Sequence, residues 1–364
     1  MRLGLFMMPL HPSYRAIADC YDRDIDQLVL ADKLGFDEAW LGEHFTEKWE
    51  NAPSPDLLIA KALALTERIR FGTGVTLLAM HEPVYLAHRV AMLDHLARGR
   101  FNWGIGLGGI PTDMALMGLD PAEARGRSTE ALEVVLGLWQ SDSSFSYQGE
   151  FFRIEAPKFN PVTERGLHMK PMQLPHPPIA VAASTPRSGS LKVAGARGWS
   201  PMSSSLLSSA FLPGHWETVV DGANSAGLTP NRSDWKIARD VFVGPTPEIA
   251  RERARTVLGR NYDVHQRPSR AGTMQMQIMK LDPSMADDDI DVDYLMDNLW
   301  IVGDPEQCAA KIRALYETVG GFGTLLSVTA DSDDPAWDHE SLRLLAEEVA
   351  PRIADLMNDR PRPT

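Results

Sequence analysis

The sequence contains few of the residues that define several common classes of protein. It has two cysteines in 364 residues, Cys20 and Cys308, each in a helix-like segment. We expect both to be small buried side chains rather than a redox pair or metal ligands. No apolar run approaches the roughly 18 residues that span a bilayer, and no charged-then-apolar leader opens the chain. We therefore expect a cytoplasmic protein with no membrane partner.

Positive charge is also scarce, with 36 Lys and Arg against 49 Asp and Glu and a net charge of −13. Nucleic-acid binding needs a basic surface, so this balance argues against a nucleic-acid partner. The ten histidines include no convincing metal site. His81, His88 and His95 are evenly spaced, but His81 precedes Pro83 and lies outside the expected helix. The acidic residues at 287–293 lack calcium-loop spacing, which indicates a solvated surface.

What the sequence does contain is a regular alternation of strand-like and helix-like segments. Apolar residues at helical spacing follow most strands, as at Leu86, Val90 and Leu93. Two later helices begin with a capping residue before proline, at Thr246 and Asp304. Eight short runs are typical of buried strands: residues 3–8, 36–41, 69–75, 101–106, 179–182, 199–202, 236–243 and 322–329.

Strict alternation implies a parallel sheet, and eight units predict an α/β fold, a closed (β/α)8 TIM barrel formed by one domain, residues 1–364. An open doubly wound sheet is the alternative. Against it, no G-x-G-x-x-G pattern follows the first strand. The "GIGLGG" of residues 104–109 misses the dinucleotide spacing, and it is either a tight turn or a ligand contact.

Two segments interrupt the alternation. Residues 141–178 contain "SFSYQGEFFRI", where aromatic residues alternate around Gly149, and this pattern predicts a hairpin insertion. Residues 259–297 include Met274, Met276, Met279 and Met285, whose flexible side chains suit either an irregular apolar ligand or ordinary packing.

Barrel enzymes carry their catalytic residues on the loops that follow the strands. Glu43 and His44 come directly after the second strand, and Gly74 and Ser184 belong to the same rim. An imidazole titrates near neutral pH, so His44 can donate or accept a proton there. The alternative is a rim histidine that is merely paired with a carboxylate.

Several segments resemble the bacterial-luciferase-like superfamily of flavin-dependent monooxygenases, and together they cover most of the chain. They are "GFDEAWLGEHF", "RIRFGTGVTLL", "HEPVYLAHRVAMLDHLARGRFNWGIGLG" and "VGDPEQCAAKI". Within the superfamily, "WENAPSPDLLIA", "AGARG" and "GGFGTL" are similar to the two-component, diketocamphane-type monooxygenases.

The resemblance implies a barrel that binds reduced FMN, supplied by a separate NAD(P)H flavin reductase, and that forms a homodimer. It implies reaction of the flavin with O2 to give a C4a-peroxyflavin, which oxygenates a small apolar carbonyl or alkene substrate. Baeyer–Villiger oxidation, hydroxylation and epoxidation all stay open, as does the identity of the substrate.

The resemblance also assigns residues around the flavin ring. His44 matches the catalytic histidine, although the family often shows Glu-His-His where this chain has Glu-His-Phe. Glu43 would orient His44 or the flavin, or cap a neighbouring loop. "FGTGV" matches the segment that carries a non-proline cis peptide bond beneath the ring, here between Gly74 and Val75.

The phosphate is assigned to "AASTPRSGSLKVAGARG". Ser188, Gly189 and Ser190 precede an apolar helical face, so they lie at a helix N-terminus, where free N–H groups and the macrodipole favour a dianion. Arg187 would add charge, and Ser184 would reach the ribityl chain. A simple Ser/Gly helix cap is the alternative.

Luciferases of the family carry an arginine where this chain has Leu107, so Arg187 becomes more important to the phosphate. The family also has a mobile lid near residues 259–297, which would exclude water from the flavin. Two other functions stay open on this scaffold. One is a deazaflavin-dependent hydride-transfer oxidoreductase, and the other is a non-catalytic flavin-binding protein.

Overall fold

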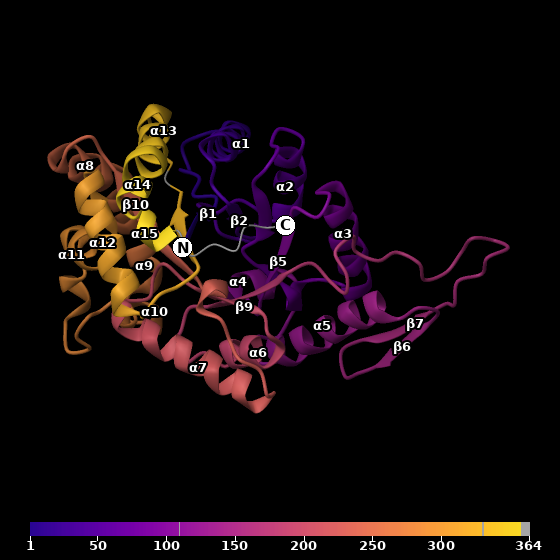
Figure 1. Ribbon diagram of the computed structural model, residues 1–364. Coiled ribbons are helices and arrows are strands. Elements are labelled where there is room, and N and C mark those ends of the chain that lie inside the picture. Colours follow the sequence, from indigo (N-terminus) through magenta and orange to yellow (C-terminus); the bar gives the residue numbers. More distant parts are fainter. Residues whose placement is uncertain (109, 330, 358–364) are drawn as a thin grey trace.

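The computed structural model describes residues 1–108, 110–329 and 331–357, and it shows a closed barrel of eight parallel strands (Figure 1). The last strand pairs with the first, so every strand ends at the same mouth of the barrel. Each strand overlaps one of the eight predicted from the sequence, and the predicted barrel fold is confirmed. The strands are β1 (Arg2–Met7), β2 (Glu38–Leu41), β3 (Arg70–Thr73), β5 (Phe101–Gly106), β8 (Ile179–Ala183), β9 (Ser200–Ser203), β10 (Lys236–Val243) and β12 (Thr324–Val328).

Two very short strands extend this barrel. β4 (Thr76–Leu77) continues β3 alongside the end of β5. β11 (Ile301–Gly303) pairs with the last residues of β10. Neither was predicted as a separate strand, because two or three residues are too few to show a periodicity.

The indole of Trp40 fills the centre of the barrel. A Cβ added at Gly72 would lie 2.4 Å from its ring, so glycine on β3 makes room for the indole. Met202 on β9 and Leu326 on β12 pack in the same interior cluster. The Lys236 ammonium lies 5.6 Å from the indole centroid and 3.6 Å from the Glu38 carboxylate, so the buried charge is paired.

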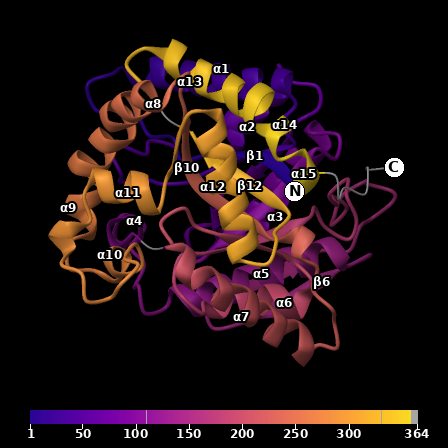
Figure 2. The same ribbon diagram turned by 60° about the vertical axis from the view of Figure 1, so that its left-hand side comes forward.

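Helices cover the outside of the barrel (Figure 2). They are α1 (Ile17–Leu34), α2 (Pro55–Leu63), α3 (Pro83–Leu96), α5 (Ala124–Gln140), α6 (Gly189–Arg197), α7 (Leu212–Ser225), α8 (Pro247–Ala254), α12 (Pro305–Thr318) and α13 (Pro335–Leu344). Thr246 and Asp304 accept hydrogen bonds from Ile249 N–H and Gln307 N–H, as the two cap patterns predicted. Both cysteines are buried, also as predicted.

Residues 335–357 form a broken helix. After α13, a π-helical turn (Leu345–Val349) leads to α14 (Ala350–Arg352), and α15 (Ala354–Met357) follows a break at Ile353. Pro351 cannot donate a helix hydrogen bond, which accounts for the interruption. Among the described residues, none of these helices or the others has the length and apolar character needed to cross a membrane.

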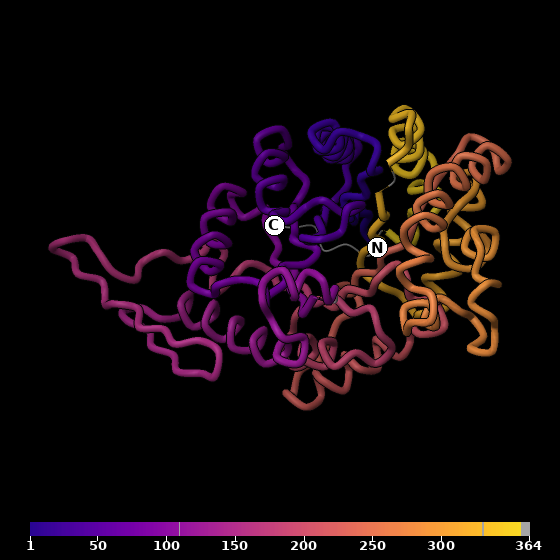
Figure 3. The backbone as a smooth tube through the Cα atoms, turned by 180° about the vertical axis from the view of Figure 1, so that it is seen from behind, coloured from indigo at the N-terminus to yellow at the C-terminus, as the bar shows by residue number. Residues whose placement is uncertain are grey.

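The predicted hairpin within residues 141–178 is present. β6 (Phe145–Gln148) pairs antiparallel with β7 (Arg153–Ala156), and Figures 1 and 3 show this insertion projecting from the barrel. The Glu130 carboxylate of α5 accepts hydrogen bonds from three successive N–H groups of the turn, those of residues 150–152. This anchor ties the turn of the hairpin to α5.

Residues 259–297 fold into short helices. They include a π-helical turn (Tyr262–Gln266), α9 (Arg267–Arg270), α10 (Met274–Gln277) and α11 (Val292–Asn298). Met276 and Met279 are buried in the core, whereas Met274 is exposed. Figures 1 and 2 show α9 and α10 beside α4 (Pro111–Leu116), which follows β5 at the barrel mouth. Around the acidic cluster, Asp287 pairs with Lys280 and Asp293 with Arg251, in agreement with the predicted solvated surface.

Candidate active site

His44 lies at the mouth of the barrel, three residues beyond the end of β2. Its Nε2 is 3.0 Å from a Glu50 carboxylate oxygen, and its Nδ1 is 3.5 Å from Asp113 Oδ2. Glu50 is buried on the same loop, and Asp113 is completely buried on α4. The imidazole therefore stands between two carboxylates, and it can hold or pass a proton.

Asp113 fixes the loop that carries His44. Besides facing the imidazole, it accepts hydrogen bonds from Thr46 N–H at 2.7 Å and from Phe45 N–H at 3.3 Å. The two residues that follow His44 are thus held by a carboxylate from another part of the mouth. Such fixed geometry is what a catalytic imidazole requires.

Glu50 also joins His44 to the segment of residues 259–297. Its second oxygen lies 3.5 Å from His265 Nε2, and the His265 ring stacks on Trp49 with the centroids 5.9 Å apart. Burial would raise the pKa of Glu50, but the His265 hydrogen bond and the charges of His44, His265 and Arg270 outweigh it and lower that pKa. Glu50 is therefore an anion between two imidazoles at neutral pH.

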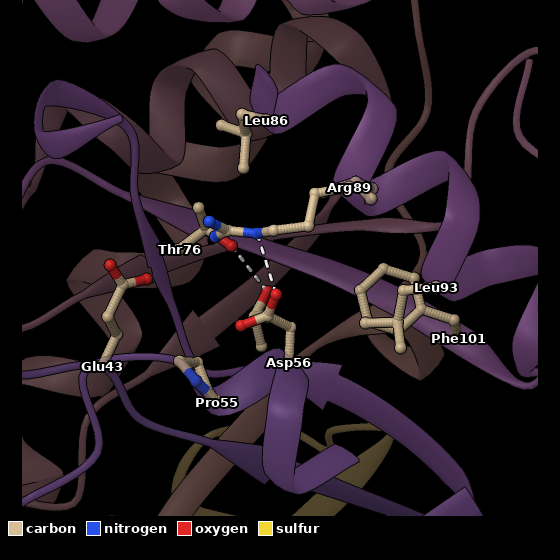
Figure 4. Close-up of a pocket in the computed structure, with 10 residues that line it drawn as sticks. Glu43, Pro55, Asp56, Thr76, Leu86, Arg89, Leu93 and Phe101 are labelled. Atoms are coloured by element: carbon tan, nitrogen blue, oxygen red, sulfur yellow. Dashed lines mark hydrogen bonds and ion pairs between the residues drawn. The ribbon is translucent and has the colours of Figure 1, made fainter. Parts of the chain in front are cut away.

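Glu43 does not face His44. Alternate residues of a strand point to opposite sides of a sheet. Trp40 points into the barrel, so Glu43, three residues later, points to the outer side of the barrel wall. One Glu43 oxygen lies 2.6 Å from His81 Nε2, and the other accepts a hydrogen bond from Leu77 N–H. Figure 4 shows Glu43 at the edge of a small hollow beside the Asp56–Arg89 ion pair.

These contacts do not involve His44, and a direct chemical role for Glu43 stays a prediction. Of the roles inferred from the sequence, capping of a neighbouring loop agrees with the contacts, because Leu77 begins the turn after β4. His81, which the sequence excluded as a metal ligand, is its partner. No sequence pattern connects residues 43 and 81, since the barrel brings their loops together.

Glycines line the mouth at the ends of three adjacent strands. Gly42 follows β2, Gly74 follows β3 and Gly106 ends β5. An added Cβ at Gly42 would lie 2.5 Å from the Met8 sulfur, and one at Gly106 would lie 2.4 Å from the Val75 side chain. The peptide bond between Gly74 and Val75 is cis, as the sequence predicted.

The predicted phosphate turn follows β8 and begins α6. Ser188 is the N-cap, and its own side chain makes no capping hydrogen bond to the N–H groups of this helix. A Cβ at Gly189 would meet nothing within 4 Å, so the N-terminus is open. The Ser188 and Ser190 hydroxyls are 2.8 Å apart, and Ser190 also donates to the Ala182 carbonyl.

The other residues predicted around this turn are accessible. Ser184 is exposed directly after β8, and the Arg187 guanidinium is exposed and pairs with Glu217 at 3.2 Å. Leu107 is half-buried at the end of β5, and Gly109 lies outside the described residues. Because the strands are parallel, this turn and His44 occupy the same mouth of the barrel, as the sequence predicted.

A buried histidine that the sequence did not single out supports the turn from beneath. His215 Nε2 donates to the Thr185 carbonyl at 2.9 Å, and its Nδ1 accepts from the Ser203 hydroxyl at 2.9 Å. The Ser203 oxygen in turn accepts from Trp235 Nε1. Burial lowers the pKa of His215, so this ring is a neutral structural group.

The first 321 residues of the chain match the sequence model of a family described as luciferase-like monooxygenase. The chain belongs to the luciferase-like monooxygenase family. This membership confirms the resemblance found in the sequence, and it confirms the prediction that the chain is an enzyme of the monooxygenase class.

Relatives of this luciferase-like chain match over nearly its whole length. It is 32% identical to the 4-hydroxyprotoasukamycin monooxygenase of Streptomyces nodosus subsp. asukaensis, over 96% of this chain and 91% of that protein. It is 30% identical to the 2,5-diketocamphane 1,2-monooxygenase 1 of Pseudomonas putida, over 97% of this chain and 99% of that protein.

A solved structure of the same luciferase-like family superposes closely. The oxygenating constituent of 3,6-diketocamphane monooxygenase from Pseudomonas putida, a type II Baeyer–Villiger monooxygenase in complex with FMN, has a TM-score of 0.90. It is 31% identical, and the match covers 96% of this chain and 98% of that one.

Proposed function

We propose that this protein is a two-component monooxygenase that uses reduced FMN and O2 to oxygenate a small apolar carbonyl or alkene. One observation carries the proposal. His44, held between two carboxylates, shares one barrel mouth with a glycine-lined rim and an open helix N-terminus. The similarity to a solved relative that holds FMN supports the same cofactor here.

The described residues fit the phosphate end of FMN at α6. Ser188, Gly189 and Ser190 present hydroxyls and free N–H groups at the positive end of the helix. Arg187 is exposed beside them, and its guanidinium can exchange the Glu217 carboxylate for a phosphate. Ser184 is exposed at the start of the same turn, where it would contact the ribityl chain. These contacts compensate for the absence of an arginine at position 107.

Three glycines at the mouth of the barrel fit the flat end of the cofactor. Gly42, Gly74 and Gly106 let the backbone at the ends of β2, β3 and β5 lie against the side chains of Met8, Phe6 and Val75, which fill the space that side chains at these positions would need. A planar ring system would rest on this rim. The Gly74–Val75 peptide would lie beneath this ring, with His44 after the end of the neighbouring strand.

When bound, reduced FMN supplies the two electrons with which O2 delivers one oxygen atom to the substrate and releases the other as water. The chain's own residues orient and protonate. His44 holds a proton at Nε2 against the Glu50 carboxylate and presents the ring to the mouth. Residues 259–297 act as the lid, because His265 and Trp49 close over Glu50 and exclude water.

The reductase partner, the homodimer and the cytoplasmic location remain part of this proposal. The test is to mix the protein–FMNH2 complex with O2 and a panel of ketones and alkenes, and to measure the oxygenated product, the H2O2 released by uncoupled reduction of O2, and oxidised FMN. Oxygenated product that forms only when both the protein and O2 are present supports the proposal. Tight deazaflavin binding with no O2 consumption would instead indicate hydride transfer, and FMN binding without any turnover would indicate a non-catalytic binder.

Replacing His44 tests its role in particular. We expect His44→Ala to lower the rate of product formation by about a hundredfold or more and to raise the fraction of FMNH2 lost as H2O2, since loss of a proton-transfer group has effects of this size. The matched control is His88→Ala, because His88 is exposed on α3, outside the candidate site. Unchanged coupling of FMNH2 to product in His44→Ala would remove His44 from the chemistry.

A further inference from the structure

Residues 49–52, which we call the Glu50 segment, hold His44 at two points. The Glu50 carboxylate lies 3.0 Å from His44 Nε2, and the Ala52 carbonyl accepts a hydrogen bond from the His44 N–H at 3.2 Å. Glu50 and Ala52 are both buried, although the segment belongs to no helix or strand. Its shape therefore comes from contacts with other parts of the chain.

The loop after β1 supplies the backbone contacts of the Glu50 segment. Leu10 and Glu50 form an isolated antiparallel bridge. The His11 N–H donates to the Trp49 carbonyl at 2.6 Å. The place of the Glu50 backbone therefore depends on the places of Leu10 and His11.

The helix α1 supplies the side-chain contacts. The Tyr21 hydroxyl donates to the Asn51 carbonyl at 2.6 Å, and Asp24 Oδ2 lies 2.9 Å from His11 Nε2. The Tyr21 ring also packs edge-on against the His11 imidazole, with the centroids 5.4 Å apart. Because Tyr21 and Asp24 are three residues apart on the helix, one face of α1 holds both loops.

Stability does not account for the pair formed by His11 and Asp24. The two residues are only 1% and 6% exposed, and burial raises the pKa of Asp24 although the His11 hydrogen bond opposes the shift. In the part of the chain that the structure describes, His11 Nδ1 is buried without a hydrogen-bond partner. Apolar side chains in place of such a buried polar pair are often equally or more stabilising. What the pair does provide is one fixed orientation of the His11 ring.

We propose that three residues outside the chemistry hold Glu50 against His44 as positioning residues. They are His11, Tyr21 and Asp24, and they act through the backbone of the Glu50 segment. This inference rests on the proposed function and extends it from the mouth of the barrel to α1. Small displacements of a proton-transfer group strongly reduce its efficiency, so we expect the defect in the coupling of FMNH2 to product rather than in FMN binding.

Tyr21→Phe is the main test, because it removes one hydroxyl and keeps the ring against His11. We expect the product formed per FMNH2 to fall about tenfold and H2O2 to rise correspondingly. The FMN dissociation constant should change less than about twofold. The matched control is Tyr85→Phe, since Tyr85 is exposed on α3, and it should change neither quantity.

A second measurement needs no flavin. Diethyl pyrocarbonate carbethoxylates accessible imidazoles, and peptide mass spectrometry gives the rate at each histidine. We expect His44 to react about threefold faster or more in Tyr21→Phe than in the wild type, the effect of losing one hydrogen bond. The exposed His88 should react at the same rate in both proteins and serves as the internal reference.

Variants of Asp24 test the other contact of α1. Asp24→Asn keeps an acceptor for His11 Nε2 and should retain most of the coupling. Asp24→Ala removes that acceptor and should lower coupling about as much as Tyr21→Phe. All variants are compared at a temperature below the melting temperature of each.

A double-mutant cycle separates positioning from a general loss of stability. If Tyr21 acts through Glu50, adding Tyr21→Phe to Glu50→Gln should lower the melting temperature further but reduce coupling no further. A merely structural role would reduce coupling by the same factor in both backgrounds.

The outcomes distinguish the inference from the proposed function. Unchanged coupling and unchanged His44 reactivity in Tyr21→Phe would overturn the inference, as would an equal further loss of coupling in the Glu50→Gln background. Equal losses in Asp24→Asn and Asp24→Ala would remove Asp24 from it. If the wild type forms no oxygenated product while His44 reacts faster in Tyr21→Phe, the proposed function fails, and α1 still holds His44 in place.

Discussion

At the scale of single residues, Glu50 is the group on which the candidate site depends. One of its oxygens faces His44 at 3.0 Å and the other faces His265 at 3.5 Å, so a single carboxylate couples the β2 loop to the helices of residues 259–297. Burial alone would raise the pKa of Glu50, but its histidine partners and Arg270 lower it, and the group stays ionised. A buried anion with two imidazole partners sets the orientation of both rings.

Glu50→Gln tests this coupling. The amide has nearly the same shape but no charge, and its NH2 group cannot accept a hydrogen bond from a histidine. We expect FMN binding to persist, while product formed per FMNH2 falls by up to about a hundredfold, since small displacements of a catalytic group have effects of this size. Product and H2O2 are measured together in single-turnover reactions.

The control for this substitution is Glu47→Gln. Glu47 is on the same loop and lies 3.8 Å from the other nitrogen of His265, but it has no contact with His44 among the described residues. Its loss should change coupling little. Equal coupling in Glu50→Gln and the wild type would mean that the carboxylate only fills space.

The sequence predicted some of these residues and not others. His44 was found because its place after a strand is a local property. Glu50 and His265 were not found, because their pairing depends on loops from distant parts of the chain meeting over one mouth. Glu43 was predicted at the rim with His44, but its contacts with His81 and Leu77 N–H involve a distant loop that the sequence alone does not bring near it.

At the scale of elements, the helix α6 and the strands it follows position the proposed phosphate site. The helix packs closely on α7, where a Cβ at Gly195 would lie 2.0 Å from the Val219 carbonyl and one at Gly222 would lie 2.1 Å from the Lys192 carbonyl. These two glycines let the helix backbones touch. The N-terminus of α6 is thereby held rigidly at the mouth, above the buried His215.

Gly189→Asp separates phosphate binding from helix stability. A carboxylate in the first turn favours the helix by roughly 0.3–1 kcal/mol, and Gly189 is exposed with free space around its Cα. The same negative charge repels a phosphate dianion. We expect an unchanged or slightly higher melting temperature together with an FMN dissociation constant raised by about tenfold or more.

Gly189→Asn is the matched control, because it has the same shape without the charge. It should bind FMN much more tightly than the Asp variant in a flavin fluorescence titration. Identical affinities for the Asp and Asn variants would place the phosphate elsewhere.

Most elements were predictable because the barrel imposes a repeated local pattern. Each barrel strand is a short apolar run and each covering helix has one apolar face, so eight units could be read without tertiary information. The strands β4 and β11 and the π-helical turns were not predicted. Their lengths and geometry follow from pairing with neighbouring elements rather than from their own residues.

At the scale of the whole molecule, the barrel closes where the last strand meets the first. β12 pairs with β1, and the loop after β12 is tied to α1. There Arg15 pairs with Asp331, and Arg23 donates to the Ser332 carbonyl at 2.6 Å. The Asp338 carboxylate of α13 then accepts the Ser332 N–H at 2.8 Å and its hydroxyl proton.

Asp338 makes the stability of this closure depend on pH. Burial raises the pKa of Asp338 from 3.8 to about 7, although both bonds from Ser332 and the charge of Arg23 oppose the shift. The folded state therefore binds a proton more tightly than the unfolded state. Its contribution to the free energy of unfolding is greatest below about pH 4, falls as pH rises towards about 7, and is constant above that.

Asp338→Asn removes this titration while keeping the shape of the side chain. The amide can accept the Ser332 N–H and donate to the Ser332 hydroxyl, so the loop stays attached. We expect the variant to gain stability relative to the wild type by up to about 1.4 kcal/mol per pH unit between about pH 4 and pH 7, and by a constant amount at higher pH. Urea unfolding of both proteins at about pH 5, 6, 7 and 8 measures the difference. A difference that does not change with pH would mean that Asp338 is already ionised throughout this range and that its buried charge is compensated by Ser332 and Arg23.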